Sequence, residues 1–295
     1  MAVPPLIVVG AGAAGTAIAR AAKAAGWPLA ALVCRSAARA RERAALAGGG
    51  QALDLPGLLA AGSAVPALLL LGVPDRAIAP VAAQLAGRDW PAGSLALHLS
   101  GSVEVEALAP LRARGLAIGA VHPLKSFVDP ARDAASMAGT LAALEGDAPA
   151  LQAAGELARA LGWKPFRLAP GSRAAWHAAA AHACNHLVAL LDQSLDLMER
   201  AGLARDEARA ALLPLLRGTL ENLADLPPAQ ALTGPVARGD ADVVRAHLAA
   251  LATAAPDVRA AYRALAQRAL RLAQARGLSQ QAVAALRDAL REPRA

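Results

Sequence analysis

Short aliphatic runs alternate with helical patterns along the first half of the chain. Six runs predict strands, at residues 6–10, 29–35, 67–73, 94–100, 116–123 and 139–146. Apolar residues at helical spacing predict helices over residues 13–25, 75–86 and 148–161, and an Arg/Ala-rich helix that ends near Ala47. Because strands that alternate with helices form βαβ units, the pattern predicts a parallel sheet.

The pattern changes near residue 168. From Arg173 onward the chain shows only long Ala/Leu periodicity, interrupted by Gly202, Pro214 and the pairs at 227–228 and 234–235. The expected fold class is therefore α/β, with a Rossmann-type doubly wound parallel sheet over residues 1–168 and an all-helical domain over residues 169–295.

Composition narrows the function classes. The 295 residues are 56% hydrophobic and carry a net charge of +7, but only 2% are aromatic and no run of five like charges occurs. We therefore expect no nucleic-acid partner. Cys34 and Cys184 are too few for a disulfide framework, and Gly and Pro interrupt the apolar runs, so we expect a cytoplasmic protein without a membrane partner.

A glycine-rich turn follows the first predicted strand. Residues 10–15 read GAGAAG and open the first predicted helix, which is the context that gives this spacing meaning. Gly10 permits the tight turn, Gly12 lets the backbone approach a pyrophosphate, and Gly15 allows close helix–strand packing. The alternative is a plain strand–helix turn. The candidate cofactor-binding residues here are Gly10, Ala11, Gly12, Ala13, Ala14 and Gly15.

The second predicted strand ends without an acidic residue. Arg35, Ser36 and Arg39 stand where NAD enzymes place an Asp or Glu for the ribose hydroxyls, and arginines suit the 2′-phosphate of NADP. We therefore expect NADP rather than NAD, although these arginines are also compatible with a solvated helix face. Gly72, Val73 and Pro74 end the next strand and are expected beside the cofactor, unless Asp75 merely caps a helix there.

Polar residues follow two later strands and one helical segment. Ser100 and Ser126 offer hydroxyls, His122 a titratable ring and Lys125 a cation for a substrate carboxylate, so all four are candidate substrate-binding residues, and Ser100 is also a candidate for the cofactor. A core histidine and a solvated lysine are the alternatives. Residues 232–240 add three further substrate-binding candidates: Thr233, Arg238 and Asp240, the last of which could instead cap a helix.

These motifs together resemble one branch of the 6-phosphogluconate dehydrogenase-like superfamily. The segments GVPD, HLSGS, HPLKSF, WHAAAAHACNHLVAL and LTGPVARGD carry the resemblance over almost the whole chain. Members have a Rossmann-like domain followed by a helical domain of unknown function, numbered 2520. More distant similarity extends to ketopantoate reductase, pyrroline-5-carboxylate reductase and F420-dependent NADP reductase. The resemblance implies hydride transfer with a small carbonyl or imine substrate and a homodimer formed through the helical domain.

The resemblance also assigns roles on the first long helix of the second half. The position of the general-acid lysine of ketopantoate reductase falls on His177, and Ala181 replaces an asparagine of that pattern. The branch commonly has lysine at the position of Arg173. Arginine can clamp a carboxylate but does not donate a proton near neutral pH. The resemblance thus implies that His177 is the catalytic proton donor and Arg173 binds substrate.

Helix geometry separates the histidines of this segment. At 100° per residue, Arg173 and Asn185 lie within about 80° of His177, whereas His182 and His186 lie on the opposite side. No third ligand accompanies that last pair, so we expect no metal site. Asn185 is expected to orient a carbonyl that His177 protonates, with a buried core histidine as the alternative.

The sequence therefore predicts an NADP-dependent oxidoreductase acting on a small carbonyl, with a 2-oxo acid such as ketopantoate as the first choice. An imine reductase resembling pyrroline-5-carboxylate reductase is one alternative. A non-catalytic NADP-binding sensor is the other, because the usual lysine is absent at Arg173.

Overall fold

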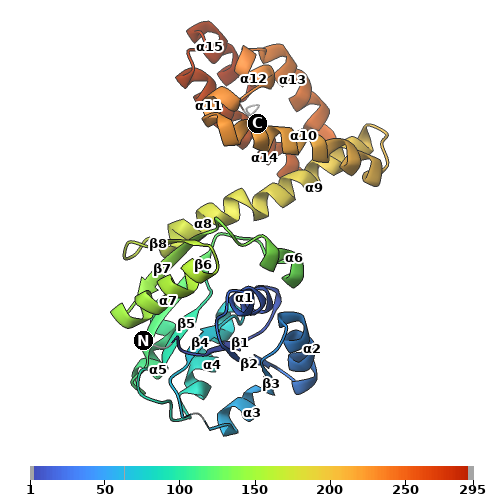
Figure 1. Ribbon diagram of the computed structural model, residues 1–295. Helices are drawn as coiled ribbons and strands as arrows, with labels where there is room; N and C mark the ends of the chain where they lie inside the picture. The colour runs from blue at the N-terminus through green and yellow to red at the C-terminus, as the bar shows by residue number, and fades with distance from the viewer. Residues whose placement is uncertain (1–2, 63, 292–295) are drawn as a thin grey trace. The chain divides into compact units, whose positions relative to one another are not determined.

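The computed structural model describes residues 3–62 and 64–291. It divides into two compact units, Met1–Cys184 and Asn185–Ala295. The first unit combines strands and helices, whereas the second contains only helices among its described residues (Figure 1). Helix α8 (Arg173–Ala183), which its pattern placed at the start of the helical domain, groups with the first unit in this division. No helix in the described ranges has the length and apolar character needed to cross a bilayer.

The described residues of the first unit form one sheet with the order β3-β2-β1-β4-β5-β6-β7-β8. Its strands are β1 (Leu6–Val9), β2 (Leu29–Cys34), β3 (Gln51–Asp54), β4 (Leu68–Leu71), β5 (Leu95–His98), β6 (Ala117–Pro123), β7 (Leu141–Gly146) and β8 (Lys164–Arg167). Strands β1 to β6 pair in parallel, and the order reverses on either side of β1. The predicted doubly wound α/β fold is thus confirmed.

Strand β7 corrects the expectation of a purely parallel sheet. It pairs antiparallel with β6 and parallel with β8. Between β6 and β7 the chain forms only α6 (Pro130–Ala135). Because this short helix does not return the chain to the opposite edge of the sheet, β7 starts where β6 ends.

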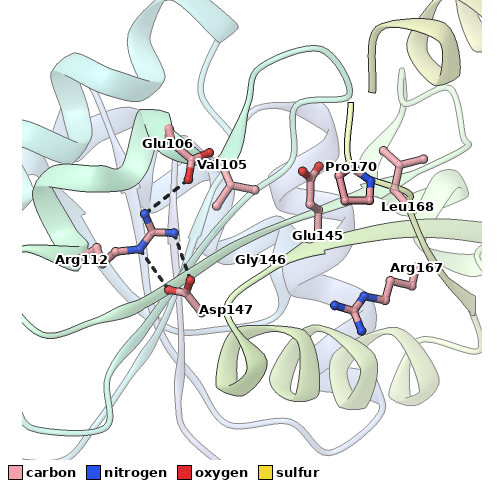
Figure 2. A pocket seen from close by; sticks show the side chains of 9 residues that line it. All are labelled: Val105, Glu106, Arg112, Glu145, Gly146, Asp147, Arg167, Leu168 and Pro170. Atoms are coloured by element: carbon pink, nitrogen blue, oxygen red, sulfur yellow. Dashed lines mark hydrogen bonds and ion pairs between the residues drawn. The ribbon is translucent and has the colours of Figure 1, made fainter. Parts of the chain in front are cut away.

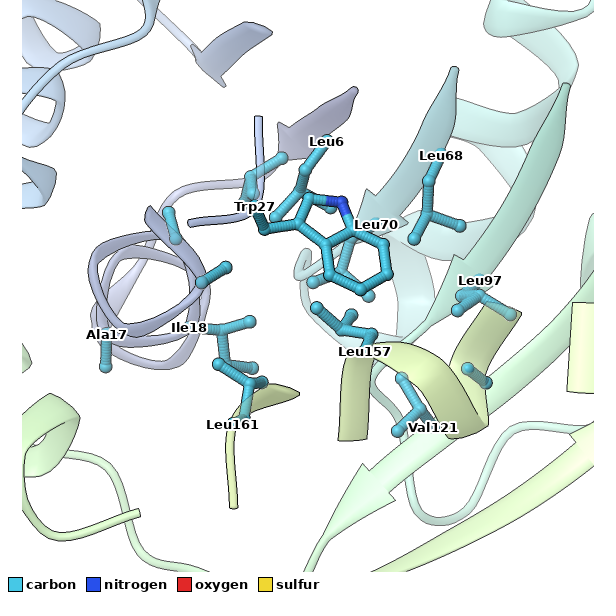
Figure 3. Close-up of a cluster of buried hydrophobic side chains, with 14 of the residues drawn as sticks. Leu6, Ala17, Ile18, Trp27, Leu68, Leu70, Leu97, Val121, Leu157 and Leu161 are labelled. Atoms are coloured by element: carbon cyan, nitrogen blue, oxygen red, sulfur yellow. The ribbon is translucent and has the colours of Figure 1, made fainter. Parts of the chain in front are cut away.

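Alternating side chains of the central strands supply two apolar layers. Leu6 and Val8 of β1 face one layer, and Ile7 and Val9 face the other. The first layer is covered by α1 (Ala13–Ala24), α2 (Ala37–Ala47) and α7 (Ala148–Ala160), and Figure 3 shows Trp27 within it. The second is covered by α3 (Leu55–Ala60), α4 (Asp75–Leu85), the 3₁₀ turn η1 (Val105–Leu108) and α5 (Ala109–Arg112). With both faces covered, the strands read as continuous aliphatic runs.

The sequence analysis missed the two outer strands. β3 and β8 are four residues long, contain polar residues and lie at the ends of the sheet order. All four residues of β8 are exposed. Neither segment has an aliphatic run, because an edge strand buries little surface, so only their pairing with β2 and β7 defines them.

The second unit comprises α9 (Asn185–Arg200), α10 (Arg205–Asp225), α11 (Pro228–Ala231), α12 (Gly234–Arg238), α13 (Ala241–Ala250), η2 (Leu251–Thr253), α14 (Pro256–Ala275) and α15 (Gln280–Ala289). Its core consists mainly of residues from α13, α14 and α15. Among the described residues of α10, only Ala208 is buried. The continuous helix expected over residues 172–186 is interrupted at Cys184, so the angular projection does not extend to Asn185.

Candidate functional site

Three loops meet at the carboxyl edge of the sheet. Gly10 follows β1 with φ +90°, and a Cβ there would lie 2.5 Å from Cγ1 of Val73 in the loop after β4. A Cβ on Gly72 would in turn lie 3.3 Å from Cδ1 of Leu99 after β5. The glycines at positions 10 and 72 therefore permit a backbone approach that a larger residue would prevent.

The glycine-rich turn fits an anionic group at the start of α1. Gly12 is the N-cap of this helix, and no atom of the described structure lies within 4 Å of the position of a Cβ there. A Cβ on Gly15 would lie 2.8 Å from the Gly10 carbonyl oxygen, and Thr16 Oγ1 donates to the Ala11 oxygen at 3.1 Å. Since the first-turn N–H groups of a helix lack intrahelical partners, this open N-terminus suits a phosphate.

Arginines surround the end of β2. Arg35 and Arg39 are exposed, and Ser36 caps α2 by accepting a hydrogen bond from the Arg39 amide at 3.3 Å. Arg43, which the sequence analysis did not select, has a side chain only 16% exposed and lies 3.6 Å from Glu42. Its buried Nε has no hydrogen-bond partner among the described residues. Arg43 follows Arg39 by four residues, so the two lie on one face of the helix, and this spacing could have identified Arg43 from the sequence.

Two histidines and a tryptophan form a cluster beside the loop after β5. Trp176 Nε1 donates to His122 Nδ1 at 2.9 Å, and the His122 and His177 ring centroids lie 5.9 Å apart. A Cβ on Gly101 would lie 2.7 Å from His122 Nε2 and 2.8 Å from His177 Cδ2. Trp176 also stacks on Phe166 of β8, at 5.9 Å between centroids. The structure thus brings His122 and His177 together, as the site prediction requires.

The His122 ring is held in its neutral form. Burial, followed by the positive charges of His177 and Arg173, lowers the pKa of His122 to about 4. Because Nδ1 accepts the Trp176 hydrogen bond, the single proton of the neutral ring lies on Nε2. Near neutral pH, His122 therefore presents an N–H donor beside Gly101.

Arg173 lies in the interior of the first unit, with its side chain 1% exposed. Its Nε and Nη2 donate to Glu145 Oε2 at 3.0 and 2.6 Å, and Nη1 donates to the Ser100 carbonyl oxygen at 2.9 Å. The guanidinium therefore fastens α8 to β7 and to the loop after β5. These bonds occupy the groups that the sequence analysis assigned to a substrate carboxylate.

The loop after β5 is fixed by its own hydroxyl groups. Ser100 Oγ accepts from the amides of Ser102 and Val103 at 3.1 and 3.0 Å. Ser102 Oγ donates to Asp75 Oδ2 at 2.5 Å, which connects this loop to the start of α4. The Ser100 hydroxyl thus shapes the loop next to the histidine cluster.

His98 is a residue that the sequence analysis missed. It ends β5, its side chain is fully buried, and neither ring nitrogen has a hydrogen-bond partner among the described residues. Burial, followed by the positive charge of Arg173, lowers the pKa of His98 to about 4. In the sequence, His98 could have been identified as a polar residue at the end of an aliphatic strand, two positions before Ser100.

Three further predicted residues follow β6 or begin α9. Lys125 Nζ donates to the carbonyl and hydroxyl oxygens of Ser136 at 3.1 and 3.0 Å, and Ser126 is exposed. Asn185 is the exposed first residue of α9, in the second unit.

In the second unit, Arg238 Nε donates to Asp240 Oδ2 at 2.8 Å, and Thr233 lines a separate cavity. Asp240 occupies the N-cap of α13, but its side chain makes no capping hydrogen bond. Among the described residues, no group of three or more His, Cys, Asp and Glu side chains has the arrangement of a metal site.

Comparisons with known proteins agree with this architecture. A Rossmann-like domain model matches residues 4–123, and the model of a domain of unknown function, DUF2520, matches residues 140–269. A search of curated proteins returns no match to the sequence.

Several solved structures share the fold over most of the chain. A Bacteroides fragilis protein described as a candidate NADP oxidoreductase is 21% identical, with a TM-score of 0.73 over 91% of this chain and 98% of its own. A Thermotoga maritima protein is 25% identical, with a TM-score of 0.71 over 92% and 99%. A reductive aminase from Aspergillus terreus, in complex with NADPH and ethyl-5-oxohexanoate, is 21% identical, with a TM-score of 0.62 over 98% and 100%. Pyrroline-5-carboxylate reductases also match. The chain therefore combines a Rossmann-like domain with a DUF2520 domain.

Proposed function

We propose that this protein is an NADP-dependent oxidoreductase that reduces a small carbonyl substrate. The observation that carries the proposal is the placement of His122 and His177 against Gly101, on the sheet edge that also bears the open glycine-rich turn. The Bacteroides fragilis protein described as a candidate NADP oxidoreductase and the NADPH complex of the reductive aminase support the choice of cofactor. Both cysteines are unpaired, which favours a cytoplasmic location.

Each part of the dinucleotide has matching residues at this edge. The N-terminus of α1 would hold the pyrophosphate, and Arg35, Ser36 and Arg39 would hold the 2′-phosphate. Gly72, Val73 and Pro74 would line the path of the cofactor toward the loop after β5. When bound, NADPH supplies the hydride.

We assign proton transfer to His177 and substrate orientation to His122. The His177 side chain is exposed in the first unit. When hydride adds to a carbonyl carbon, the carbonyl oxygen becomes negative, and a protonated imidazole can donate its proton to that oxygen. The neutral His122 ring would donate from Nε2 to the same oxygen.

Carboxylate binding falls to residues other than Arg173. Since Arg173 is bound to Glu145 and Ser100, it acts as a positioning residue for the loop after β5. Among the described residues, Lys125 donates only to neutral oxygens of Ser136, so no carboxylate there compensates its charge and it can attract that of a substrate. Ser126, which is exposed beside Lys125, completes the proposed substrate-binding set of the first unit.

A 2-oxo acid such as ketopantoate is the first substrate to test. The fold similarity to a reductive aminase favours a cyclic or secondary imine as the second candidate. NADPH oxidation measured with a panel of 2-oxo acids and cyclic imines separates the two classes. Binding of NADPH without turnover of any compound would instead support a cofactor-binding sensor.

The mechanistic test is His177→Ala. Loss of the proton donor is expected to lower kcat by about 100-fold while the Kd for NADPH stays unchanged. His182→Gln, on the same helix and also exposed, is the matched control and should keep its activity. Unchanged turnover in His177→Ala would remove this residue from the mechanism.

We also propose that the second unit mediates a homodimer. Helices α9 and α10 expose five large apolar side chains, Val188, Leu190, Leu215, Leu220 and Leu223, and Leu226 directly after α10 is exposed as well. Such a surface on a single chain indicates an interaction site. Light scattering should show a dimer that Leu220→Glu dissociates, whereas the control Arg287→Glu on α15 leaves it intact; a monomeric wild-type protein would contradict the proposal.

A further inference from the structure

A positively charged cavity lies in the second unit, between α14 and the end of α15. It has a volume of about 620 Å³, which is within the range of ligand sites. Four arginines contribute to its lining: Arg263, Arg271, Arg287 and Arg291. Among the described residues that line it, none is acidic, and none is proposed above to bind NADP or substrate.

The net charge of the chain is concentrated around this cavity. Residues 258–291 contain seven arginines against one acidic residue, Asp288, a formal charge of +6, whereas the whole chain carries +7. Asp288 lies 3.9 Å from Arg291, and both side chains are exposed, so water weakens this contact. Such a concentration of one sign of charge attracts anions.

Arg263 is a buried cation without a carboxylate partner in the described structure. It is 8% exposed, and its Nη1 donates to the carbonyl oxygens of Leu290 and Arg291 at 2.8 and 2.7 Å. Both acceptors are neutral, and the negative end of the α15 dipole offsets only about half of one charge. Because a buried charge is costly unless it is compensated, a bound anion would stabilise this arrangement.

Two other arginines of the cavity have available donors. Arg271 and Arg287 are exposed, and neither side chain forms a hydrogen bond or an ion pair with a described residue. A guanidinium presents its N–H donors in a planar fork that fits the oxygens of a phosphate. These two residues can therefore bind an anion without losing a contact within the described protein.

Helix geometry places the arginines along one opening. Arg271 follows Arg263 by eight residues on α14, so the two lie on the same side of the helix, about 12 Å apart along its axis. Gln267, halfway between them, also lines the cavity. The bonds of Arg263 to two carbonyl groups hold the end of α15, and with it Arg287, beside α14. An elongated anion can therefore contact arginines of both helices, whereas a single small anion cannot span them.

The cavity of the first unit shows a different balance of charge. It has a volume of about 270 Å³, and Figure 2 shows Arg112 bonded to Asp147 and Glu106. Arg167 forms no ion pair with a described residue, but its side chain lies on the opposite face of the sheet from Glu145 (Figure 2). Three carboxylates against two guanidinium groups line that cavity, which disfavours an anion there.

We propose that the cavity between α14 and α15 binds a polyphosphate chain. Successive phosphate groups can pair with arginines that one phosphate cannot reach together. Small side chains such as Ala260 and Ala264 lie beside the arginines, and no aromatic residue is among the described lining residues, so a nucleotide base has no stacking surface. The recognised chemistry is the phosphate chain itself, either free or as part of a nucleoside triphosphate.

Calorimetric titration of the full-length protein with inorganic tripolyphosphate, at about 50 mM salt, tests the proposal. Tripolyphosphate should bind with a Kd below about 1 mM. Arg271→Gln and Arg287→Gln should each weaken binding by about tenfold, because each removes a charge-assisted contact. The matched control is Arg268→Gln, an exposed arginine of α14 that does not line the cavity, and it should keep the wild-type Kd.

Three further ligands define the site. Sulfate should bind at least about tenfold more weakly than tripolyphosphate, because one small anion meets fewer of the arginines. ATP that binds as tightly as tripolyphosphate would identify nucleoside triphosphates as a source of the chain, and ATP that binds at least about tenfold more weakly would restrict the site to free polyphosphate. The Kd for NADPH should be equal in all four proteins, which separates this cavity from the proposed dinucleotide site.

Several results would overturn the proposal. Absence of tripolyphosphate binding, or unchanged binding by Arg271→Gln and Arg287→Gln, would place no polyphosphate in this cavity. An equal loss in Arg268→Gln would reduce the effect to general attraction by the basic surface, and sulfate binding equal to that of tripolyphosphate would exclude a site for a chain. A single-stranded oligonucleotide that binds more tightly than tripolyphosphate, with the same loss in Arg268→Gln, would indicate a nucleic-acid surface instead.

Discussion

Acidification should destabilise the first unit through His98. Its pKa is lowered from 6.5 to about 4 in the folded protein, because the ring is fully buried near the positive charge of Arg173. The backbone of Glu104 and then the charge of Asp75 act in the opposite direction, and the neighbouring His122 adds a further positive charge when it is protonated. Between pH 6.5 and 4 the unfolded chain therefore binds a proton at this position that the folded protein does not bind.

The sign and size follow from proton linkage. When the unfolded state binds more protons, stability rises with pH, so stability is lost as the pH falls through this window. A difference of 6.5 against about 4 corresponds to about 3 kcal/mol in total, of which about 2 kcal/mol is lost between pH 7.5 and 5. His122 contributes in the same direction, but less, because it is partly exposed.

Tryptophan fluorescence isolates this effect to one unit. All four tryptophans, Trp27, Trp90, Trp163 and Trp176, lie within the first unit. Urea unfolding followed with excitation selective for tryptophan, at pH 5 to 7.5, therefore reports the free energy of unfolding of that unit alone. Above pH 5 the buried carboxylates with lowered pKa values, such as Asp133, stay ionised.

The decisive variant is His98→Leu. Within the described residues, neither nitrogen of this buried ring forms a hydrogen bond of ordinary geometry, so replacing the ring by an apolar side chain should change stability at pH 7.5 by less than about 1 kcal/mol. The same variant should remove about 2 kcal/mol of the loss at pH 5, whereas the control His182→Gln on α8 should retain the wild-type pH dependence. A pH dependence in His98→Leu equal to that of the wild type would refute the reasoning.

Three further outcomes are expected. Arg173→Gln should lower the free energy of unfolding by about 3 kcal/mol, because it leaves a carboxylate and a carbonyl without their partner, whereas Arg167→Gln should cost less than about 0.5 kcal/mol in the same urea experiment. Gly101→Ala should displace both imidazoles and lower the rate of NADPH oxidation by about 10- to 100-fold. The control Gly218→Ala, where a Cβ meets no described atom within 4 Å, should keep the wild-type rate. A wild-type rate in Gly101→Ala would contradict the assigned cluster. Arg39→Gln should weaken NADPH binding by about tenfold and leave NADH binding unchanged, as measured by fluorescence titration; an equal loss for both cofactors would exclude a 2′-phosphate contact.

The central strands and the glycine-rich turn were predictable because their signals are local. A strand buried on both faces must be aliphatic throughout, so β1, β2, β4 and β5 are visible as runs of Leu, Val and Ala. The outer strands β3 and β8 were not predictable, because their structure depends on pairing with a neighbour rather than on their own composition.

Residue types at the candidate site were predictable, but their roles were not. His122 and His177 were selected from the sequence, and the structure places their rings 5.9 Å apart. No pattern indicated that Trp176 donates to His122, since these residues lie 54 positions apart. Arg173 was selected as a substrate ligand, and only tertiary contacts reveal its bonds to Glu145 and Ser100.

The sequence by itself determined the Rossmann-type turn, the βαβ alternation and the histidines of α8, because periodicity and short motifs depend on neighbouring residues. The tertiary structure decided which polar atoms remain available. Hydrogen bonding and burial depend on groups brought together from distant segments, as with Arg173, whose charge is compensated, and Arg167, whose charge is not. His98 shows the same dependence on distant segments. The sequence presents it as an ordinary polar residue, but in the folded protein both of its ring nitrogens are buried without a hydrogen-bond partner among the described residues.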